Sequence, residues 1–210
     1  MSAVPPAVVA VESLSIDLSR DTRAKPNTVV DDVSLRIGAG EIVGLVGESG
    51  SGKSVTALSL LRLLPRAQAR YGAGSRIVVL GRDVLAATEE TLRAMRGADV
   101  SMIFQEPMTA LNPVIRIGRQ MAEVLRRHRA IGAAEARERS RALLADMQIA
   151  DPMRVLDSWP HELSGGMRQR VMIAMAFSCE PSLIVADEAT TALDVTVQAQ
   201  SLELLRTRVR

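Results

Sequence analysis

An eight-residue segment, GESGSGKS at residues 47–54, carries the clearest chemistry in the sequence. It fits the pattern G-x-x-x-x-G-K-[ST] between an expected strand and an expected helix, which is the context that a phosphate-binding loop requires. Its glycines allow backbone N–H groups to close around an anion, the amine of Lys53 supplies positive charge, and the hydroxyl of Ser54 is expected to hold Mg²⁺. The residues expected to contact the phosphates are Gly47, Glu48, Ser49, Gly50, Ser51, Gly52, Lys53 and Ser54.

Two acidic residues follow the apolar run LIVA at 183–186. Such a run predicts a buried strand, so Asp187 and Glu188 are expected at its carboxyl end, the edge where ligands bind in parallel sheets. We expect Asp187 to hold Mg²⁺ by way of water, and Glu188 to polarise the water that attacks the terminal phosphate. Many solvated strands also end in acids, so this assignment depends on the phosphate loop earlier in the chain.

The segment LSGGMRQR at 163–170 predicts a second anion-binding site. Ser164 is suited to cap a helix, and Gly165 with Gly166 leaves the helix N-terminus open to close approach. The alternative is an ordinary capped helix. These residues also leave open whether such a site completes the first one within a subunit or across a dimer.

The elements that position these motifs indicate an α/β fold. The first two expected strands are antiparallel edge strands around a polar loop, and the last two suit a buried parallel sheet. A helix is expected at 54–64, because apolar residues recur there at helical spacing until Pro65. The expected strands are residues 8–18, 34–37, 41–47, 77–80, 99–104 and 182–188.

A long stretch between the last two strands reads as an inserted helical subdomain. Its periodic segments predict helices at 117–129, 133–147 and 167–178, with prolines between them. The Arg-rich part also contains glutamates, which favours solvated helix faces with opposite-charge neighbours over a lipid-binding patch.

Composition excludes several classes of protein. With 210 residues and 47% hydrophobic content, the chain is too apolar for a disordered protein. Its net charge of +2 identifies no partner, and one Trp, one Tyr and two Phe are too few for a surface that stacks successive bases. The apolar runs are shorter than the roughly 18 residues that a membrane span needs, and the N-terminus does not resemble a secretory signal. We therefore expect a cytoplasmic chain.

Together, the motifs resemble the ATP-binding-cassette (ABC) family, in which Walker A, Q-loop, signature, Walker B and D-loop occur in that order. Gln105 in MIFQEP matches the Q-loop, and Asp194 in TALD matches the D-loop. Longer strings are similar to one branch, the ATPase subunits of dipeptide, oligopeptide and nickel importers. These strings cover residues 102–113, 160–176 and 189–200.

The resemblance implies a P-loop NTPase (RecA-like) core with an antiparallel β edge and an inserted α-helical subdomain. It also implies two cassettes that sandwich two ATP molecules, so that Ser164 and Gly166 act in trans and Asp194 reports across the dimer. Gln105 would contact Mg²⁺ or the attacking water and link the site to membrane-spanning subunits. The expected domains are 1–106 (core, with Walker A and Q-loop), 107–178 (helical subdomain, with the signature) and 179–210 (core, with Walker B and D-loop).

The implied partners are membrane-spanning permease subunits, a second ABC ATPase subunit in a homo- or heterodimer and, indirectly, a substrate-binding protein, with no nucleic acid. The implied location is peripheral, on the cytoplasmic face of the cell membrane. The implied cofactors are ATP and Mg²⁺, and the implied activity is ATP hydrolysis coupled to uptake of peptides or nickel.

Three features depart from the family pattern. Leu18 replaces the aromatic residue that stacks on adenine, and Ala189 replaces a proline. The C-terminal part of the cassette, with its switch histidine, is expected to be missing, and neither His128 nor His161 fits that role. Two alternatives follow: a non-hydrolysing or truncated nucleotide-binding subunit, and a non-transport ABC ATPase that acts on nucleic acid or the ribosome.

Overall fold

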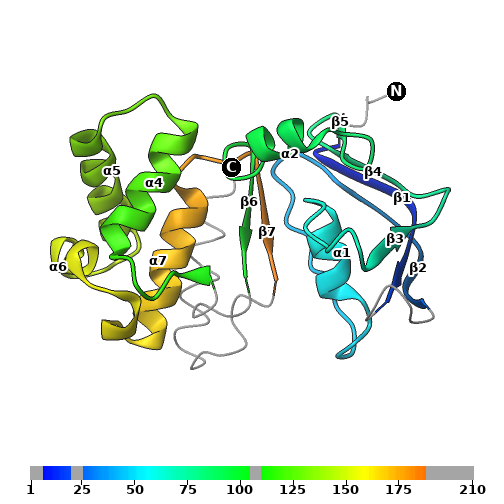
Figure 1. Ribbon diagram of the computed structural model, residues 1–210, viewed down its shortest axis with the longest axis horizontal. Coiled ribbons are helices and arrows are strands. Elements are labelled where there is room, and N and C mark those ends of the chain that lie inside the picture. Colours follow the sequence, from blue (N-terminus) through cyan, green and yellow to red (C-terminus); the bar gives the residue numbers. More distant parts are fainter. Residues whose placement is uncertain (1–6, 20–25, 105–109, 188–210) are drawn as a thin grey trace. The chain divides into compact units, whose positions relative to one another are not determined.

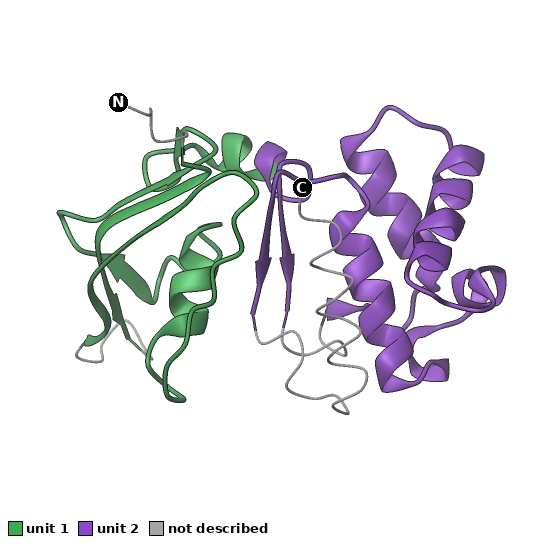
Figure 2. Cartoon of the chain, turned by 180° about the vertical axis from the view of Figure 1, so that it is seen from behind, with its two compact units in different colours: residues 1–93, 209–210 green, residues 94–208 purple. Residues whose placement is uncertain are grey.

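The computed structural model describes residues 7–19, 26–104 and 110–187, which form two compact units (Figures 1 and 2). The first unit contains the described residues up to Arg93, with an antiparallel sheet and the phosphate loop. The second begins at Ala94 and contains a parallel strand pair and most of the helices. The three domain ranges expected from the sequence stay a prediction.

An antiparallel sheet forms the frame of the first unit. Its strands lie in the order β2-β1-β4-β5, and β3 also pairs with β1. The antiparallel pairing expected for the first two strands is confirmed, although the second starts at Asn27 rather than at residue 34. The strands are β1 (Val9–Leu18), β2 (Asn27–Ile37), β3 (Ala69–Tyr71), β4 (Arg76–Val79) and β5 (Arg82–Asp83).

The buried side chains of strand β1 switch from odd-numbered to even-numbered residues halfway along the strand. Val9 and Val11 are buried, and so are Leu14 and Ile16, which have the opposite parity in sequence. The pairing with β2 shifts between Val11 and Leu14, and Ser13 there has a φ of 44°. This β-bulge keeps both apolar pairs on the same buried face, which explains why the alternation in the sequence is only partial.

Two expectations around the phosphate loop are wrong. Residues 41–47 form no strand, and their apolar side chains are exposed, with Val46 at 94%. A strand needs a hydrogen-bonded neighbour, and the sheet of the first unit does not pair with this segment within the described residues. The helix expected at 54–64 is α1 (Lys53–Ser59), which gives way to turns where Arg62 adopts a φ of 50°.

The second unit contains the expected parallel strands. β6 (Val100–Ile103) pairs with β7 (Leu183–Ala186) in parallel, with Val100 opposite Leu183. Their burial is only partial, with Val100, Ile103 and Val185 buried. Ala186 is exposed, so the full burial expected for the second of these strands is wrong.

Three expected helices of the second unit are confirmed, and two short ones were missed. The missed helices begin at Pro152 and Pro160, because proline suits the first helical position, where its missing N–H costs no bond. The helices after α1 in the described part of the chain are α2 (Glu89–Met95), α4 (Ile117–His128), α5 (Ala133–Asp146), α6 (Pro152–Asp157), the 3₁₀ turn η1 (Pro160–Glu162) and α7 (Gly165–Phe177). Among the described residues, every helix is too short or too polar to span a lipid bilayer.

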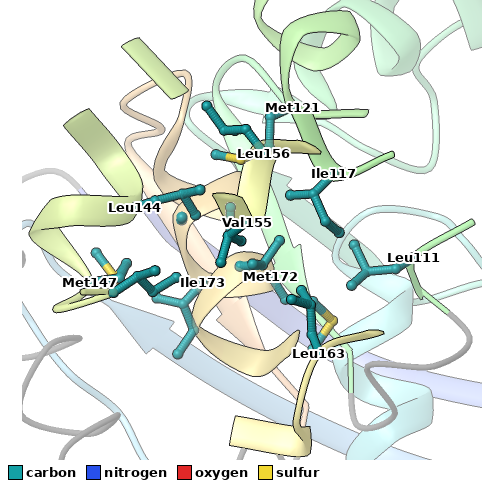
Figure 3. Packing of buried hydrophobic residues seen from close by; sticks show 14 of the residues in the cluster. Leu111, Ile117, Met121, Leu144, Met147, Val155, Leu156, Leu163, Met172 and Ile173 are labelled. Atoms are coloured by element: carbon teal, nitrogen blue, oxygen red, sulfur yellow. The ribbon is translucent and has the colours of Figure 1, made fainter. Parts of the chain in front are cut away.

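A hydrophobic core joins α4, α5, α6 and α7 (Figure 3). Ile117 and Met121 of α4 meet Leu144 of α5 and Leu156 of α6 in this core, and all four side chains are at most 1% exposed. Burying side chains of this size contributes about 1.5–3 kcal/mol each, so the core fixes the helices on one another.

The solvated, ion-paired faces expected for the Arg-rich helices are confirmed on α5. Arg139 pairs with Glu135 at 2.8 Å, and Arg141 pairs with Glu138 at 2.7 Å. The hydrogen bond from Arg141 lowers the pKa of the Glu138 carboxyl. Exposed pairs of this kind contribute little to stability, so these charges mainly keep the outer face in water.

The backbones of α4 and α6 approach closely at Gly118. A Cβ at this position would lie 2.8 Å from the carbonyl oxygen of Leu156. We predict that Gly118→Ala lowers the free energy of unfolding by about 1–3 kcal/mol, because a backbone carbonyl cannot rotate away. The matched control is Gly165→Ala, where a Cβ would meet nothing within 4 Å. Urea denaturation measures both, and equal effects would contradict the close approach.

The C-terminal end of α4 places His128 against the turn before β6. A side chain at Gly97 would come within 2.8 Å of Nε2 of His128. Burial lowers the pKa of His128 below its usual 6.5, and the charges of Arg127 and Arg129 lower it further, while Asp99 opposes them. The folded chain therefore keeps this imidazole neutral to a lower pH than the unfolded chain does.

We predict that the free energy of unfolding falls as the pH drops below about 6.5, because the unfolded state then binds the proton of His128 more readily than the folded state. His128→Gln should remove this part of the pH dependence, and His161→Gln, at the chain's other histidine, should retain it. Urea denaturation between pH 7.5 and 5 at roughly half-unit steps tests this. A His128→Gln curve parallel to that of the parent would refute it.

Candidate functional site

The phosphate loop is an exposed turn that leads directly into α1. Its backbone reverses through a hydrogen bond from the N–H of Ser51 to the carbonyl of Glu48, 3.2 Å long. Gly50 and Gly52 have φ values of 83° and 89°, in the left-handed region that other residues rarely adopt. Two glycines of the motif therefore have a specific conformational reason for their positions.

Strand β2 supports the end of this loop. A Cβ on Gly52 would lie 2.7 Å from the carbonyl oxygen of Val29 and 3.1 Å from a methyl of Val30. The carbonyl of Gly52 accepts the N–H of Thr56 at 2.8 Å, which starts the helix. Sequence reasoning did not identify this contact, because no local pattern connects Gly52 with a strand more than twenty residues earlier.

The side chain of Lys53 turns back over the loop. Its Nζ donates to the carbonyl oxygens of Gly47 and Glu48, at 2.8 and 2.7 Å. A Cβ on Gly47 would lie 2.7 Å from Oγ of Ser51, so a side chain there would require this hydroxyl to rotate away. The amine is thus held against an exposed backbone turn, where its charge can meet an anion. Ser54 follows in the first turn of α1.

Asp187 lies directly after β7, as expected. Its N–H donates to the carbonyl of Ile103 at 2.9 Å, which extends the contact with β6 by one residue. The side chain is half-buried. Within the described residues, no group of three or more His, Cys, Asp or Glu side chains could hold a metal ion. The metal site expected from Ser54, Gln105 and Asp187 therefore stays a prediction.

Several expected site residues lie outside the described residues. These are Gln105 of the Q-loop, Glu188 after Walker B, and Asp194 of the D-loop. Their expected roles stay predictions.

Ser164 caps helix α7, as the sequence predicts. Its hydroxyl accepts the N–H of Met167 at 3.3 Å. Ser164 and Gly165 are exposed, Gly166 is half-buried, and a Cβ on Gly165 would meet nothing within 4 Å. The start of α7 is therefore open to solvent, while later residues such as Ile173 anchor the helix in the core.

The segment before Ser164 contains a stack that sequence reasoning missed. The guanidinium carbon of Arg116 lies 4.2 Å from the ring centroid of Trp159. The ring of His161 is nearly parallel to that of Trp159, with centroids 6.1 Å apart and an angle of 13° between the planes. The only sequence signal was that Trp159 is the single tryptophan of the chain, close to a motif.

The fold matches that of a nucleotide-binding cassette. The chain aligns with the ATP-binding cassette MJ0796, in a dimeric post-hydrolysis state bound to ADP and Pi, with a TM-score of 0.81 at 25% identity. The alignment covers 94% of this chain and 81% of that chain. This confirms the expected fold class, an α/β P-loop core with an antiparallel β edge and a helical subdomain.

The ABC transporter family model matches residues 30–191, so the chain belongs to the ABC transporter family. It is 61% identical over 181 residues to the "Probable D,D-dipeptide transport ATP-binding protein DdpD" of Escherichia coli (strain K12), covering 86% of this chain and 55% of that protein. It is 58% identical over 179 residues to the "Peptidoglycan transport ATP-binding protein YejF" of Agrobacterium fabrum (strain C58 / ATCC 33970), covering 85% of this chain and 33% of that protein. The chain thus spans about half the length, or less, of these two relatives.

The contact between Gly52 and β2 generates a prediction about the phosphate loop. Gly52→Ala should lower the free energy of unfolding by about 1–3 kcal/mol more than Gly50→Ala, because both strain a positive φ but only the first forces a Cβ onto a backbone carbonyl. At Gly50 a Cβ would meet nothing within 4 Å. Thermal or urea denaturation of the two variants measures the difference. Equal losses would show that β2 does not constrain the loop.

Proposed function

We propose that this chain forms the ATP-binding and hydrolysing part of a subunit that drives an ABC importer for peptides. The observation that carries the proposal is the phosphate loop, where Lys53 is bonded to the carbonyls of Gly47 and Glu48 over a glycine-shaped turn. A charged amine on an exposed turn suits the phosphates of a nucleotide. The names of the two relatives support a peptide or peptide-containing substrate rather than nickel.

Within this proposal, the residues of the chain divide the work of hydrolysis. Lys53 and the N–H groups of the loop would bind the phosphates, and Ser54 and Asp187 would hold Mg²⁺. Glu188 would accept a proton from the water that attacks the terminal phosphate as ADP leaves. Gln105 orients that water. When bound, Mg²⁺ would neutralise charge on the phosphates.

The open start of α7 supports a second phosphate contact. Ser164, Gly165 and Gly166 present backbone N–H groups at the positive end of a helix of 13 residues, and this end is accessible to solvent. We propose that they bind the nucleotide of a second ATPase subunit, and that Asp194 lies at the same dimer contact. The dimer would act on membrane-spanning permease subunits, with a substrate-binding protein delivering the peptide.

The test removes the cation of the loop. Lys53→Ala should weaken binding of a fluorescent ATP analogue at least ~tenfold, because charge-assisted bonds to phosphate are lost. Lys25→Ala, at the chain's other lysine, is the control and should bind like the parent. Circular dichroism checks that both variants are folded. If Lys53→Ala kept the affinity of the parent, the loop would not be the nucleotide site.

A further inference from the structure

The stack of Arg116, Trp159 and His161 lies at the entry to the signature helix α7. Besides covering the Trp159 ring, Arg116 donates from Nη1 to the carbonyl of Asp157 at 2.6 Å. One guanidinium therefore holds both the backbone and the indole of the segment that leads to Ser164. A planar guanidinium suits this double role, since it can stack and donate at once.

The start of α4 also holds this segment through its backbone. The N–H of Ile117 donates to the carbonyl of Ser158 at 3.0 Å, and Gly118 allows the close approach to Leu156. From the side of α5, Arg137 places Nη2 2.9 Å from both carboxylate oxygens of Asp157. Residues 156–159 are thus held by two helices.

A single tight turn separates Trp159 from the signature residues. The N–H of Trp159 donates to a carboxylate oxygen of Glu162 at 2.9 Å, and the N–H of Leu163 donates to the carbonyl of Pro160 at 3.2 Å. Leu163 is 4% exposed and belongs to the hydrophobic core (Figure 3). Ser164 comes next and is exposed, so its position is set by the anchored residues immediately before it.

The chain just before Arg116 is also fixed, by hydrogen bonds to the side chain of Gln120. The amide of Gln120, 8% exposed, donates to the carbonyls of Asn112 and Ile115 at 3.0 and 2.7 Å, and accepts the N–H of Asn112 at 2.9 Å. These bonds tie residues 112–115 to α4, just before Arg116. These hydrogen bonds therefore fix the backbone from which Arg116 extends toward Trp159.

We infer that Arg116 and Trp159 are positioning residues that hold the signature loop in the shape that binds nucleotide across the dimer. The inference rests on the proposed function, because it requires Ser164 to meet a nucleotide bound by a second subunit. The stack sets the direction in which η1 leaves α6, and so where Ser164 and the N–H groups of α7 point. Neither residue touches the nucleotide of its own phosphate loop in this scheme.

The first experiment separates positioning from nucleotide binding. Trp159→Ala and Arg116→Ala should weaken MgATP-dependent dimerisation by roughly tenfold or more, while binding of a fluorescent ATP analogue to the monomer stays within about twofold of the parent. Trp159→Phe keeps a ring face for the guanidinium and should recover most of the dimerisation. Sedimentation velocity and fluorescence titration measure the two quantities.

The matched control is Arg119→Ala, which removes an exposed arginine from the next turn of the same helix. Within the described residues its side chain makes no hydrogen bond or ion pair, so dimerisation should match that of the parent. Thermal denaturation identifies any variant that has lost its fold. Should Trp159→Ala unfold, Arg116→Ala and Trp159→Phe carry the test, since both leave the hydrophobic core intact.

The second readout uses Trp159 itself, because it is the only tryptophan in the chain. Arg116→Ala should change its emission without nucleotide, since the guanidinium no longer covers the ring. MgATP should then change the emission of the parent, as the dimer forms next to the stack, and leave that of Arg116→Ala nearly unchanged.

The outcomes distinguish the inference from the proposed function. If Trp159→Ala and Arg116→Ala dimerise like the parent, or Arg119→Ala fails as they do, the positioning role is wrong. If both stack variants lose monomer nucleotide binding as well, the stack supports the fold rather than the signature loop, and the inference is again overturned. If the parent binds nucleotide without dimerising, the inference fails while nucleotide binding stands. If the parent does not bind ATP at all, the proposed function itself fails.

Discussion

The approach of Gly52 to the backbone of β2 is the constraint on which the phosphate loop depends. The loop must stay exposed to receive phosphates, so it cannot be fixed by burial of its own side chains. It is fixed instead where Gly52 fits against Val29 without a Cβ, in a left-handed conformation that directs the chain into α1. The bonds from Lys53 to the loop carbonyls then hold the charge in place.

The second unit also contains an exposed segment, the start of α7, that other residues must hold in place. Ser164 and Gly165 are exposed at the start of α7, and the residues on either side are anchored, Leu163 in the hydrophobic core and Trp159 beneath Arg116. An exposed helix start with open N–H groups is an anion site only if its direction is fixed. The buried contacts of α4 and α6 supply that fixed direction, and Ser164 and Gly165 remain exposed at the start of the helix.

The chain belongs to the ABC transporter family, and the proposed function assigns both sites to the binding of nucleotide. In the proposed function, the phosphate loop of one cassette and the signature helix of another form the two halves of one nucleotide site. The dimeric cassette with a similar fold supports that arrangement for the present chain. Two relatives are named as dipeptide and peptidoglycan transport ATP-binding proteins, and these names support the peptide-containing substrate of the proposed function.

The sequence by itself determined the parts that local patterns encode. The spacing of the glycines and Lys53 predicts the phosphate loop, and Ser164 predicts the N-cap of a helix. The pattern of apolar residues predicts β6, β7, α4, α5 and α7. It misplaced 41–47, because an apolar run becomes a strand only beside a partner strand. The tertiary structure alone decided which distant residues meet, such as Gly52 with Val29 and Arg116 with Trp159. Those contacts depend on how the chain folds back on itself, and no spacing along the sequence records that.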